Sequence, residues 1–411
     1  MMTLLSIKQF FNDMRHQKLR TLLTMFGILW GTVSIVLLMS FGTGLHKSQI
    51  KRFKGLGENI SIVWGGRTSQ PWQGLPRGRR VRFTEEDVSM LKQTVPSIQR
   101  ISPEFTRYSA PLKSHRENLV ARVSGVWPEF SEMRNTIPQT GGRFINDIDI
   151  EKRRRVIFIG NILADRLFPG EDPIGQILQL DGTPFVVVGV MKDKEQNSSY
   201  GGRDTRNAFI PASTYHSTYT QRYVNNMVVQ SYSMDGMEDV KNAIYRYMAA
   251  KYKFDPDDTE ALSIWDTSEG FRFFNTFFMA FRIFLVGIGC FTLITGGIGV
   301  TNIMNVVLEE RTKEIGIKMA LGAKRYVILM QFMMETALLT ATGGLIGFII
   351  AYGIVKIFPV FGLSEELGNP IIDFYATIGA VMALGLIAFL AGLFPARRAS
   401  SIEPVKALKL F

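Results

Sequence analysis

The stretch Ile283–Leu308, IFLVGIGCFTLITGGIGVTNIMNVVL, contains no Lys, Arg, Asp or Glu and decides the fold. A helix of about 20 apolar residues crosses the roughly 30 Å of hydrocarbon in a bilayer, so this stretch predicts a membrane span. Three further runs are equally free of charge and long enough to cross: Thr21–Leu45, Thr336–Val355 and Phe374–Ala396. The sequence therefore predicts four transmembrane helices.

The overall composition alone would suit a soluble protein, because 46% of the 411 residues are hydrophobic and 20% are charged. The apolar residues are instead concentrated in the four charge-free runs. This segregation excludes a disordered chain, a collagen-like fibre, a disulfide scaffold and an all-soluble enzyme.

The net charge of +11 follows the predicted membrane topology. Such an excess can indicate nucleic-acid binding, but eight of the excess positive charges lie in residues 1–20, 309–325 and 397–411, beside the spans. Basic residues favour the cytoplasmic side, so both termini and the 309–325 loop are predicted to be cytoplasmic. Residues 46–273 and 357–373 then face outward, and no nucleic-acid partner is expected.

The predicted organisation is one span, a large outer insertion and then three spans. Residues 1–20 carry apolar side chains at helical spacing between charged ones, which predicts an amphipathic helix on the inner membrane surface. The other predicted segments are 21–45 first span, 46–273 outer domain, 274–308 stalk and second span, 309–325 cytoplasmic loop, 326–356 third span, 357–373 outer loop, 374–396 fourth span and 397–411 cytoplasmic tail.

Strand and helix signals in the outer domain predict two βαβ halves. Their elements, in chain order, are Asn59–Trp64, Thr84–Gln93, Ile98–Tyr108, Met227–Ser231, Asp235–Tyr252 and Ala261–Ile264. Thr84 is expected to open the first helix and Asp235 to cap the second. This order predicts a split ferredoxin-like subdomain formed by residues 46–110 and 225–270.

Residues 111–224 are predicted to form a second, inserted and mainly-β subdomain. Val156–Ile159 is a short apolar strand, and Ile177–Leu180 and Phe185–Val190 form a hairpin around Asp181-Gly182. The fold class is therefore an α-helical membrane protein with four transmembrane helices and a large α+β outer domain.

No catalytic, cofactor-binding or metal-ligating constellation is present in the sequence. The dipeptide Gly-Lys does not occur, so no phosphate-binding loop of the G-x-x-x-x-G-K type is available for nucleotide hydrolysis. H-E-x-x-H is absent as well, and the four histidines are scattered along the chain. The chain is therefore expected not to be an enzyme. Glu335, near the inner end of the third span, is expected to snorkel towards water.

The cytoplasmic loop between the second and third spans is the most unusual segment. In EERTKEIGIK, Glu309–Lys318, charges recur at helical spacing, and Glu309 with Lys313 and Glu314 with Lys318 are favourable i, i+4 pairs. Ile315 and Met319 share an apolar stripe. The stripe is expected to be exposed. A short helix with an exposed apolar stripe either docks into a groove on another protein or rests on lipid headgroups, and the residues alone leave both interpretations open.

The run GGIGVTNIMNVVLEERTKEIGIKMALGAKRYVILMQFMMETALL, Gly296–Leu339, closely resembles the core signature of the MacB and FtsX superfamily of ABC-transporter permeases. Lys18–Gly44 is similar to the first span of that family, and Leu56–Gly66 is similar to the strand that follows it. Ala164–Asp193 resembles the periplasmic core domain of MacB-type members, and Pro395–Leu408 resembles the terminal motif. These blocks cover nearly the whole chain in the expected order.

The resemblance implies a dimer of permeases in the bacterial inner membrane, partnered by cytoplasmic ATPase subunits that bind ATP and Mg. MacB-type members often carry the ATPase fused at the N-terminus; only about twenty residues precede the first span here, so a separate ATPase polypeptide is expected. The resemblance makes the cytoplasmic loop a coupling helix, with contacts expected from Glu309, Glu310, Arg311, Lys313, Glu314, Ile315, Ile317, Lys318 and Met319.

The resemblance leaves two functional classes open. The first is a permease that exports drugs, peptides or lipid-like substrates by mechanotransmission, together with a periplasmic adaptor and an outer-membrane channel. The second is an FtsX-like signalling permease that activates envelope hydrolases, and a lipoprotein-releasing permease shares the same build. The GEDPIG block, Gly170–Gly175, and the large outer domain favour export.

Overall fold

The computed structural model describes residues 18–196, 199–364 and 368–403. The chain divides into two compact units: a membrane unit, which extends to Gln49 and resumes at Asn275, and an outer unit, Ile50–Phe274. The boundary falls inside two helices, α2 (Lys18–Lys54) and α9 (Thr267–Glu310), and each of them continues through it without a break. The amphipathic helix predicted for residues 1–20 lies almost entirely outside the described residues.

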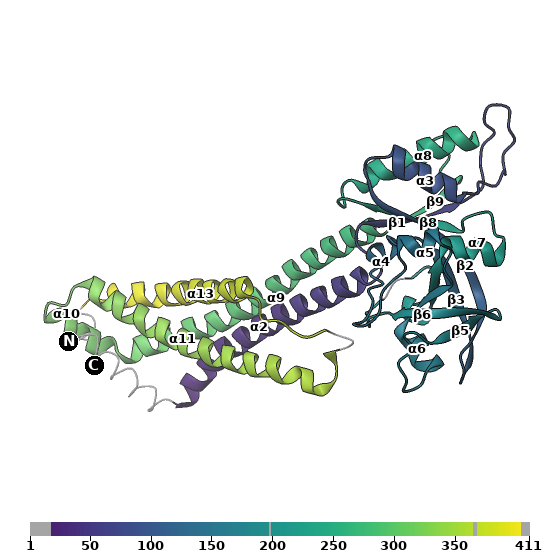
Figure 1. Cartoon of the computed structure of the whole chain (residues 1–411). Coiled ribbons are helices and arrows are strands. Elements are labelled where there is room, and N and C mark those ends of the chain that lie inside the picture. Colours follow the sequence, from purple (N-terminus) through teal and green to yellow (C-terminus); the bar gives the residue numbers. More distant parts are fainter. Residues whose placement is uncertain (1–17, 197–198, 365–367, 404–411) are drawn as a thin grey trace. The chain divides into compact units, whose positions relative to one another are not determined.

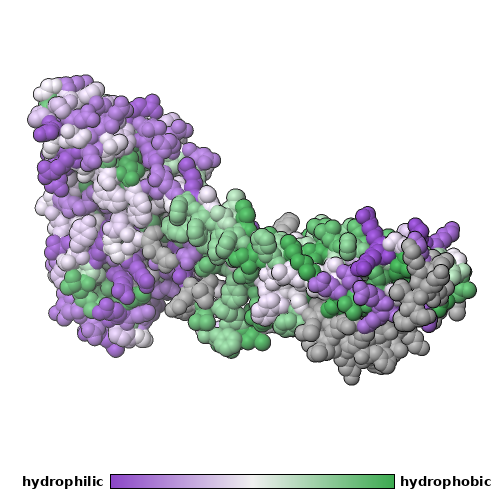
Figure 2. Space-filling model, turned by 180° about the vertical axis from the view of Figure 1, so that it is seen from behind, coloured by the Kyte–Doolittle hydropathy of each residue, from purple (hydrophilic) through white to green (hydrophobic). Residues whose placement is uncertain are grey.

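The described part of the membrane unit contains four helices long and apolar enough to cross a bilayer, as predicted. They are α2, α9, α11 (Arg325–Ile357) and α13 (Phe374–Ser400), with the short α10 (Thr312–Ala320) between α9 and α11. A 3₁₀ helix, η2 (Phe358–Phe361), follows α11 and ends at Gly362, whose φ of 72° suits glycine. Hydrophobic surface gathers over these helices, whereas hydrophilic surface covers most of the outer unit (Figure 2).

Glycines allow α2 and α9 to pack closely within the membrane unit. A Cβ atom on Gly296 would lie 2.9 Å from the carbonyl oxygen of Gly27, so Gly296 has no room for a side chain, and a Cβ atom on Gly27 would lie 3.3 Å from the Gly296 Cα. At the inner ends of the helices, buried side chains of α2, α9, α10, α11 and α13 form one hydrophobic cluster. Its members include Ile28, Met304 and Phe332, so the short helix α10 and the spans share a core there.

The first half of the outer unit has ferredoxin-like topology. Its elements are β1 (Ile60–Gly65), α3 (Glu85–Thr94), β2 (Ile98–Lys113), β8 (Asn226–Ser231), α8 (Met237–Tyr252) and β9 (Leu262–Asp266). The strands follow the order β2-β8-β1-β9 and are antiparallel throughout, which is the arrangement that two βαβ halves produce. Helices α3 and α8 lie side by side (Figure 1), and the hydroxyl of Tyr252 donates to Asp87 between them.

The second half of the outer unit is inserted between β2 and β8 and is mainly β, as predicted. Its elements are β3 (Asn118–Val126), α4 (Phe130–Met133), α5 (Asp147–Glu151), β4 (Val156–Ile159), α6 (Asn161–Leu167), β5 (Ile177–Leu180), β6 (Thr183–Val190), η1 (Asp204–Arg206), β7 (Ala208–Pro211) and α7 (Ala212–Tyr219). Strand order is β3-β7-β4-β6-β5-β2, and a further pairing of β3 with β2 closes these strands into a ring.

Strand β2 belongs to both halves of the outer unit. Residues from Ile98 to Glu104 pair with β8, whereas residues from Glu104 to Lys113 pair with β3, and the last two also pair with β5. The boundary predicted at residue 110 therefore falls inside one continuous strand. The two halves share a backbone ladder and are not separate lobes on a linker.

One predicted turn is present in the structure, and one predicted helix cap is not. Asp181 and Gly182 have φ values of 49° and 78°, the pair of positive angles that a tight hairpin turn requires, and they join β5 to β6 as predicted. The prediction that Asp235 caps the second helix is wrong. Helix α8 begins at Met237 with Gly236 as its N-cap, and the Gly236 N–H donates to the hydroxyl of Ser233.

A buried group of charges fastens the segment between β6 and β7 to the rest of the outer unit. We call residues 191–196 and 199–207 the strap. The Arg134 guanidinium donates to both carboxylate oxygens of Asp204 at 2.9 Å and to the Leu56 carbonyl at 3.0 Å. The Lys194 ammonium donates to Asp204 at 2.8 Å. Burial opposes ionisation of Asp204, but the two neighbouring cations prevail and lower the pKa of its carboxyl below the ordinary value.

A second buried carboxylate, Glu104 on β2, completes this network. It accepts hydrogen bonds from Arg122, Ser124 and Asn226, at 2.8 to 2.9 Å, and from the hydroxyl of Tyr200 on the strap. Burial raises the pKa of Tyr200 well above its ordinary value, so this hydroxyl stays protonated and donates. The strap thus binds to the strand that both halves of the outer unit share.

Candidate coupling site at the inner ends of the helices

Helix α10 is a separate helix set between two spans. Helix α9 ends at Glu310, Arg311 forms the break, and α10 starts at Thr312. After Ala320 the chain turns at Gly322, whose φ of 96° is accessible mainly to glycine, and α11 starts at Arg325. The break and the turn therefore present α10 as a short element between the inner ends of α9 and α11.

One face of α10 is buried against the spans. Ile315 is 4% exposed and belongs to the inner hydrophobic cluster, and the half-buried Met319 packs against the same cluster. The expectation that these two residues form an exposed stripe is wrong for Ile315, because its partners are the helices of its own chain. A force applied to α10 would act directly on a side chain that is part of the membrane-unit core.

The opposite face of α10 is exposed and also apolar. Ile317 is 44% exposed and Leu321, just past the helix end, is 84% exposed. Their spacing of four residues places them on one side of the helix, and the exposed Lys313 lies one turn earlier on that side. Both the Ile317–Leu321 pair and the Ile315–Met319 pair can be recognised in the sequence. Only the packing of α10 against the spans shows which of the two is buried.

The charged residues of the loop differ in their positions. Glu314 and Lys318 form the predicted i, i+4 ion pair, with 2.8 Å between Oε1 and Nζ, on a partly exposed face. Glu309 and Glu310 are exposed at the end of α9. The break at Arg311 separates Glu309 from Lys313, so the same-helix spacing predicted for that pair does not apply.

Arg311 forms a buried ion pair with Glu335 of α11. Its Nη1 donates to both carboxylate oxygens at 3.1 and 3.2 Å, and Gln331 Nε2 donates to Oε1 at 3.2 Å. Glu335 is only 5% exposed, so the expectation that it snorkels towards water is wrong. The carboxylate instead remains inside the protein because a cation and an amide compensate it. The pair ties the break before α10 to the third span.

The described residues contain no group of three or more His, Cys, Asp or Glu side chains arranged to hold a metal ion. The features that this part of the chain does offer are structural. They are a short helix with one face in the core, an exposed apolar face and a buried ion pair at its start.

The protein families that this chain matches agree with this architecture. Residues 21–247 match the MacB-like periplasmic core domain, and residues 286–404 match the FtsX-like permease C-terminal domain. Together these matches cover most of the chain. The chain therefore belongs to the MacB/FtsX-type ABC transporter permeases.

Two relatives illustrate the range of this family. The chain is 30% identical over 409 residues to the macrolide export ATP-binding/permease protein MacB of Chlorobaculum tepidum, covering 98% of this chain and 61% of that protein. It therefore spans about three-fifths of the length of the MacB relatives it matches. It is 29% identical to the uncharacterized ABC transporter permease YvrN of Bacillus subtilis, covering 97% of this chain and 98% of YvrN.

Among solved structures, the extracellular domain of the noncanonic ABC-type transporter YknZ from Gram-positive bacteria matches 51% of this chain and 100% of its own, at 21% identity and a TM-score of 0.42.

Proposed function

We propose that this chain is a permease subunit whose inner loop receives movement from a cytoplasmic ATPase and passes it to the outer unit. The ATPase, a separate polypeptide, binds ATP and Mg, and a second permease copy completes a dimer in the bacterial inner membrane. Both termini are cytoplasmic and the outer unit is periplasmic. Family membership supports the ATPase partner, since ABC transporters depend on one.

The burial of Ile315 carries this proposal. Packed interiors yield little to compression, so a helix with one face in the core cannot move independently of that core. The Arg311–Glu335 pair adds a second attachment, between the break before α10 and α11. A displacement of α10 is therefore transferred to the inner ends of α9 and α11 and is not absorbed within the loop.

The continuity of α2 and α9 supports transmission towards the outer unit. Each helix crosses the boundary between the units without a break, and a regular helix keeps its hydrogen bonds when it tilts as a rigid body. The described membrane segments contain one buried carboxylate, Glu335, and it is paired with Arg311. A mechanical role suits such helices better than a charge relay.

The exposed face of α10 supports a docking role for Ile317 and Leu321. Exposed apolar side chains on a short amphipathic helix fit a hydrophobic groove on a partner, and the flanking Lys313 and Lys318 supply positive charge around them. Ile315 and Met319, on the opposite face of α10, link this helix to the spans. Glu309 and Glu310, exposed at the end of α9, and Glu314 on α10 add charged contacts to the same partner.

Export is the transport role that we propose for the assembly. The curated relatives named MacB are described as macrolide export proteins, which supports drugs, peptides or lipid-like molecules as the substrate class. In this role the outer unit acts with a periplasmic adaptor and an outer-membrane channel, so the substrate is handled outside the bilayer by mechanotransmission.

The test replaces Ile317 and Leu321 together with Asp and measures vanadate-sensitive ATP hydrolysis by the complex purified from membranes. We expect the ATPase subunit and its activity to be lost from the preparation, while the permease remains in the membrane at its normal level. Val120→Asp is the matched control, because Val120 is an exposed apolar residue of the outer unit. Undiminished assembly and hydrolysis in the double variant would remove the coupling role from α10.

A further inference from the structure

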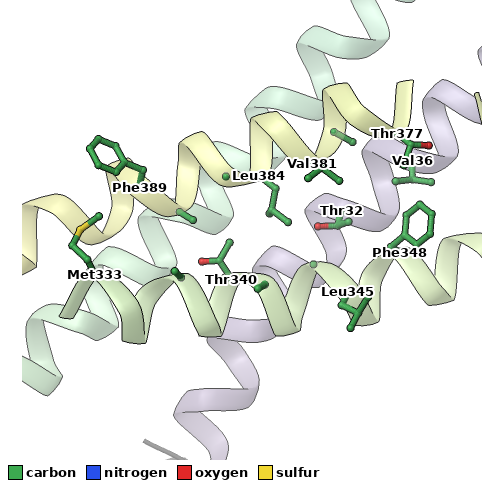
Figure 3. Close-up of a pocket in the computed structure, with 16 residues that line it drawn as sticks. Thr32, Val36, Met333, Thr340, Leu345, Phe348, Thr377, Val381, Leu384 and Phe389 are labelled. Atoms are coloured by element: carbon green, nitrogen blue, oxygen red, sulfur yellow. The ribbon is translucent and has the colours of Figure 1, made fainter. Parts of the chain in front are cut away.

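A cavity of about 530 Å³ lies within the membrane unit, between α2, α11 and α13 (Figure 3). We call it the slot. Met333 and Phe389 lie at one end of it, and Phe348 and Thr377 lie at the other. Between these ends the walls are formed largely by alanines, glycines and leucines of α11 and α13. The slot is thus open where bulky side chains are absent and bounded where they are present.

The slot is long and narrow. At about 1.5 Å per residue, the helical stretch from Met333 to Phe348 is roughly 22 Å long, and the stretch from Thr377 to Phe389 is roughly 18 Å. The volume is the space open to the centre of a water-sized sphere, so dividing it by this length and adding a radius of about 1.4 Å on each side gives a width of roughly 8–9 Å, whereas a helix with its side chains is about 10–12 Å wide. A helix of a second copy therefore does not fit inside.

A single hydrocarbon chain does fit these dimensions. Carbon atoms pack at about 3.5–4.0 Å, so an alkyl chain is about 4–5 Å thick and fits within the width of the slot. One leaflet is about 15 Å of a hydrocarbon core that is about 30 Å thick, so the slot is long enough for the full depth of an acyl tail.

The hydroxyl protons of the slot are already used within the protein. The hydroxyls of Thr32, Thr340 and Thr377 each donate to the backbone carbonyl four residues earlier, at 2.9 Å. No Lys, Arg, Asp or Glu is among the described residues that line it. An occupant therefore gains packing contacts and no hydrogen bonds from these hydroxyl protons, which excludes hydrophilic molecules and suits an alkyl tail.

Beyond the Phe348 end, α11 carries a cation at the right place for a headgroup. Tyr352 and Lys356 follow Phe348 by one and two turns, and both are exposed. The Lys356 ammonium lies 5.8 Å from the centroid of the Tyr352 ring. Aromatic and basic side chains at the end of a membrane helix contact the headgroup region, where an ammonium can pair with a phosphate.

We propose that the slot binds one acyl chain of a membrane phospholipid, with the headgroup phosphate held at Lys356. The lipid fills a gap that the helices leave between α11 and α13 and so supports the packing of the third and fourth spans. This proposal rests on the membrane spans alone and does not depend on a coupling role for α10.

The test uses the full-length chain in detergent, labelled with a phosphatidylglycerol that carries a photoreactive diazirine near the end of one acyl chain. Cross-linked peptides are mapped by mass spectrometry. We expect cross-links on α11 and α13 at residues that line the slot. Filling the slot with Ala341→Phe should abolish these cross-links, whereas Ile349→Phe, on the exposed face of α11, should leave them unchanged. Equal labelling of the slot in both variants would overturn the proposal.

Three further measurements keep the result decisive. If Ala341→Phe does not yield a folded protein, Lys356→Glu should give a several-fold loss of co-purified phospholipid in native mass spectrometry, and no loss would contradict the headgroup contact. Cross-linking of a photoreactive diacylated peptide in the slot, with no cross-linking of the phospholipid there, would identify the slot as a site for acylated cargo. Disulfide formation between copies that carry Ala341→Cys would identify it as an interface. Either outcome would overturn a phospholipid occupant.

Discussion

Buried charge is arranged differently in the two units. In the outer unit, Asp204 and Glu104 each accept several hydrogen bonds and take part in a network that joins the strap, β2 and Leu56, which lies just past α2. At the inner end of the membrane unit, Glu335 has one cation, Arg311, and one amide, Gln331. The network of Asp204 and Glu104 holds several segments of the outer unit together. The Arg311–Glu335 pair holds only the break between α9 and α10 to α11.

This difference suggests different tasks. A carboxylate with many partners has no alternative arrangement of similar energy, so the outer unit is expected to move as a rigid body. A single ion pair at the start of α10 holds a position but restricts little else. The comparison predicts that removing a carboxylate has its largest effect on stability in the outer unit and a smaller, more local effect at the inner end.

The largest effect is expected from Asp204→Asn. The amide keeps the size of the carboxyl but leaves Arg134 and Lys194 buried without an anion, which should lower the free energy of unfolding of the outer unit by about 3–5 kcal/mol. Hydrogen exchange of the β1 and β8 amides, measured on the full chain by mass spectrometry, reports this loss. Glu195→Gln, an equivalent change at a half-exposed ion pair of the strap, should cost no more than about 1 kcal/mol.

The pH dependence of the Asp204 ion pairs tests the same contrast between the two units. Because the pKa of Asp204 is lower in the folded protein than in the unfolded chain, its ionisation stabilises the fold above the ordinary Asp value of about 3.9. That contribution is lost as the pH falls through the lower, folded-state pKa. The stability gap between the wild type and Asp204→Asn should therefore narrow in acid. A gap that stays constant from neutral pH to strong acid would contradict an ionised Asp204.

The elements that could be predicted from the sequence are those with local causes. Val156–Ile159 is a strand because four consecutive apolar residues are all buried, and the β5–β6 hairpin follows from Asp181-Gly182. Thr84 opens α3 because its N–H and hydroxyl both donate to Asp87, three residues on. Charge-free length alone was enough to place the four spans.

The remaining features depend on residues far apart in the chain. Nothing near β3 indicates that it pairs with both β7 and β2 to close a ring. Arg311 and Glu335 are separated by a helix and a turn, so their pairing could not be read from helical spacing. For α10, both apolar pairs fit an amphipathic helix, and only the surrounding spans decide that Ile315 is buried. The coupling role of the loop residues stays a prediction.

A smaller and more local effect is expected from Glu335→Gln. Arg311 keeps a hydrogen-bond acceptor but loses its anion, so the local free energy of opening of α10 should fall by about 1–3 kcal/mol. Hydrogen exchange of the α10 amides measures this, and ATP hydrolysis by the purified complex should fall with it. The swapped variant, Arg311→Glu with Glu335→Arg, should recover part of both. Unchanged exchange in the single variant would show that the pair does not hold α10.

The smallest effect on stability is expected from Lys318→Gln. The ion pair of Lys318 with Glu314 spans one helical turn and is more than a third exposed on both sides, so screening by water limits its contribution to about 0.5 kcal/mol or less. Exchange of the α10 amides should therefore match the wild type. If the exposed face of α10 contacts a partner, ATPase recovery should fall all the same, because a charge at the contact is lost. A stability loss above about 1 kcal/mol would instead group this pair with the buried one.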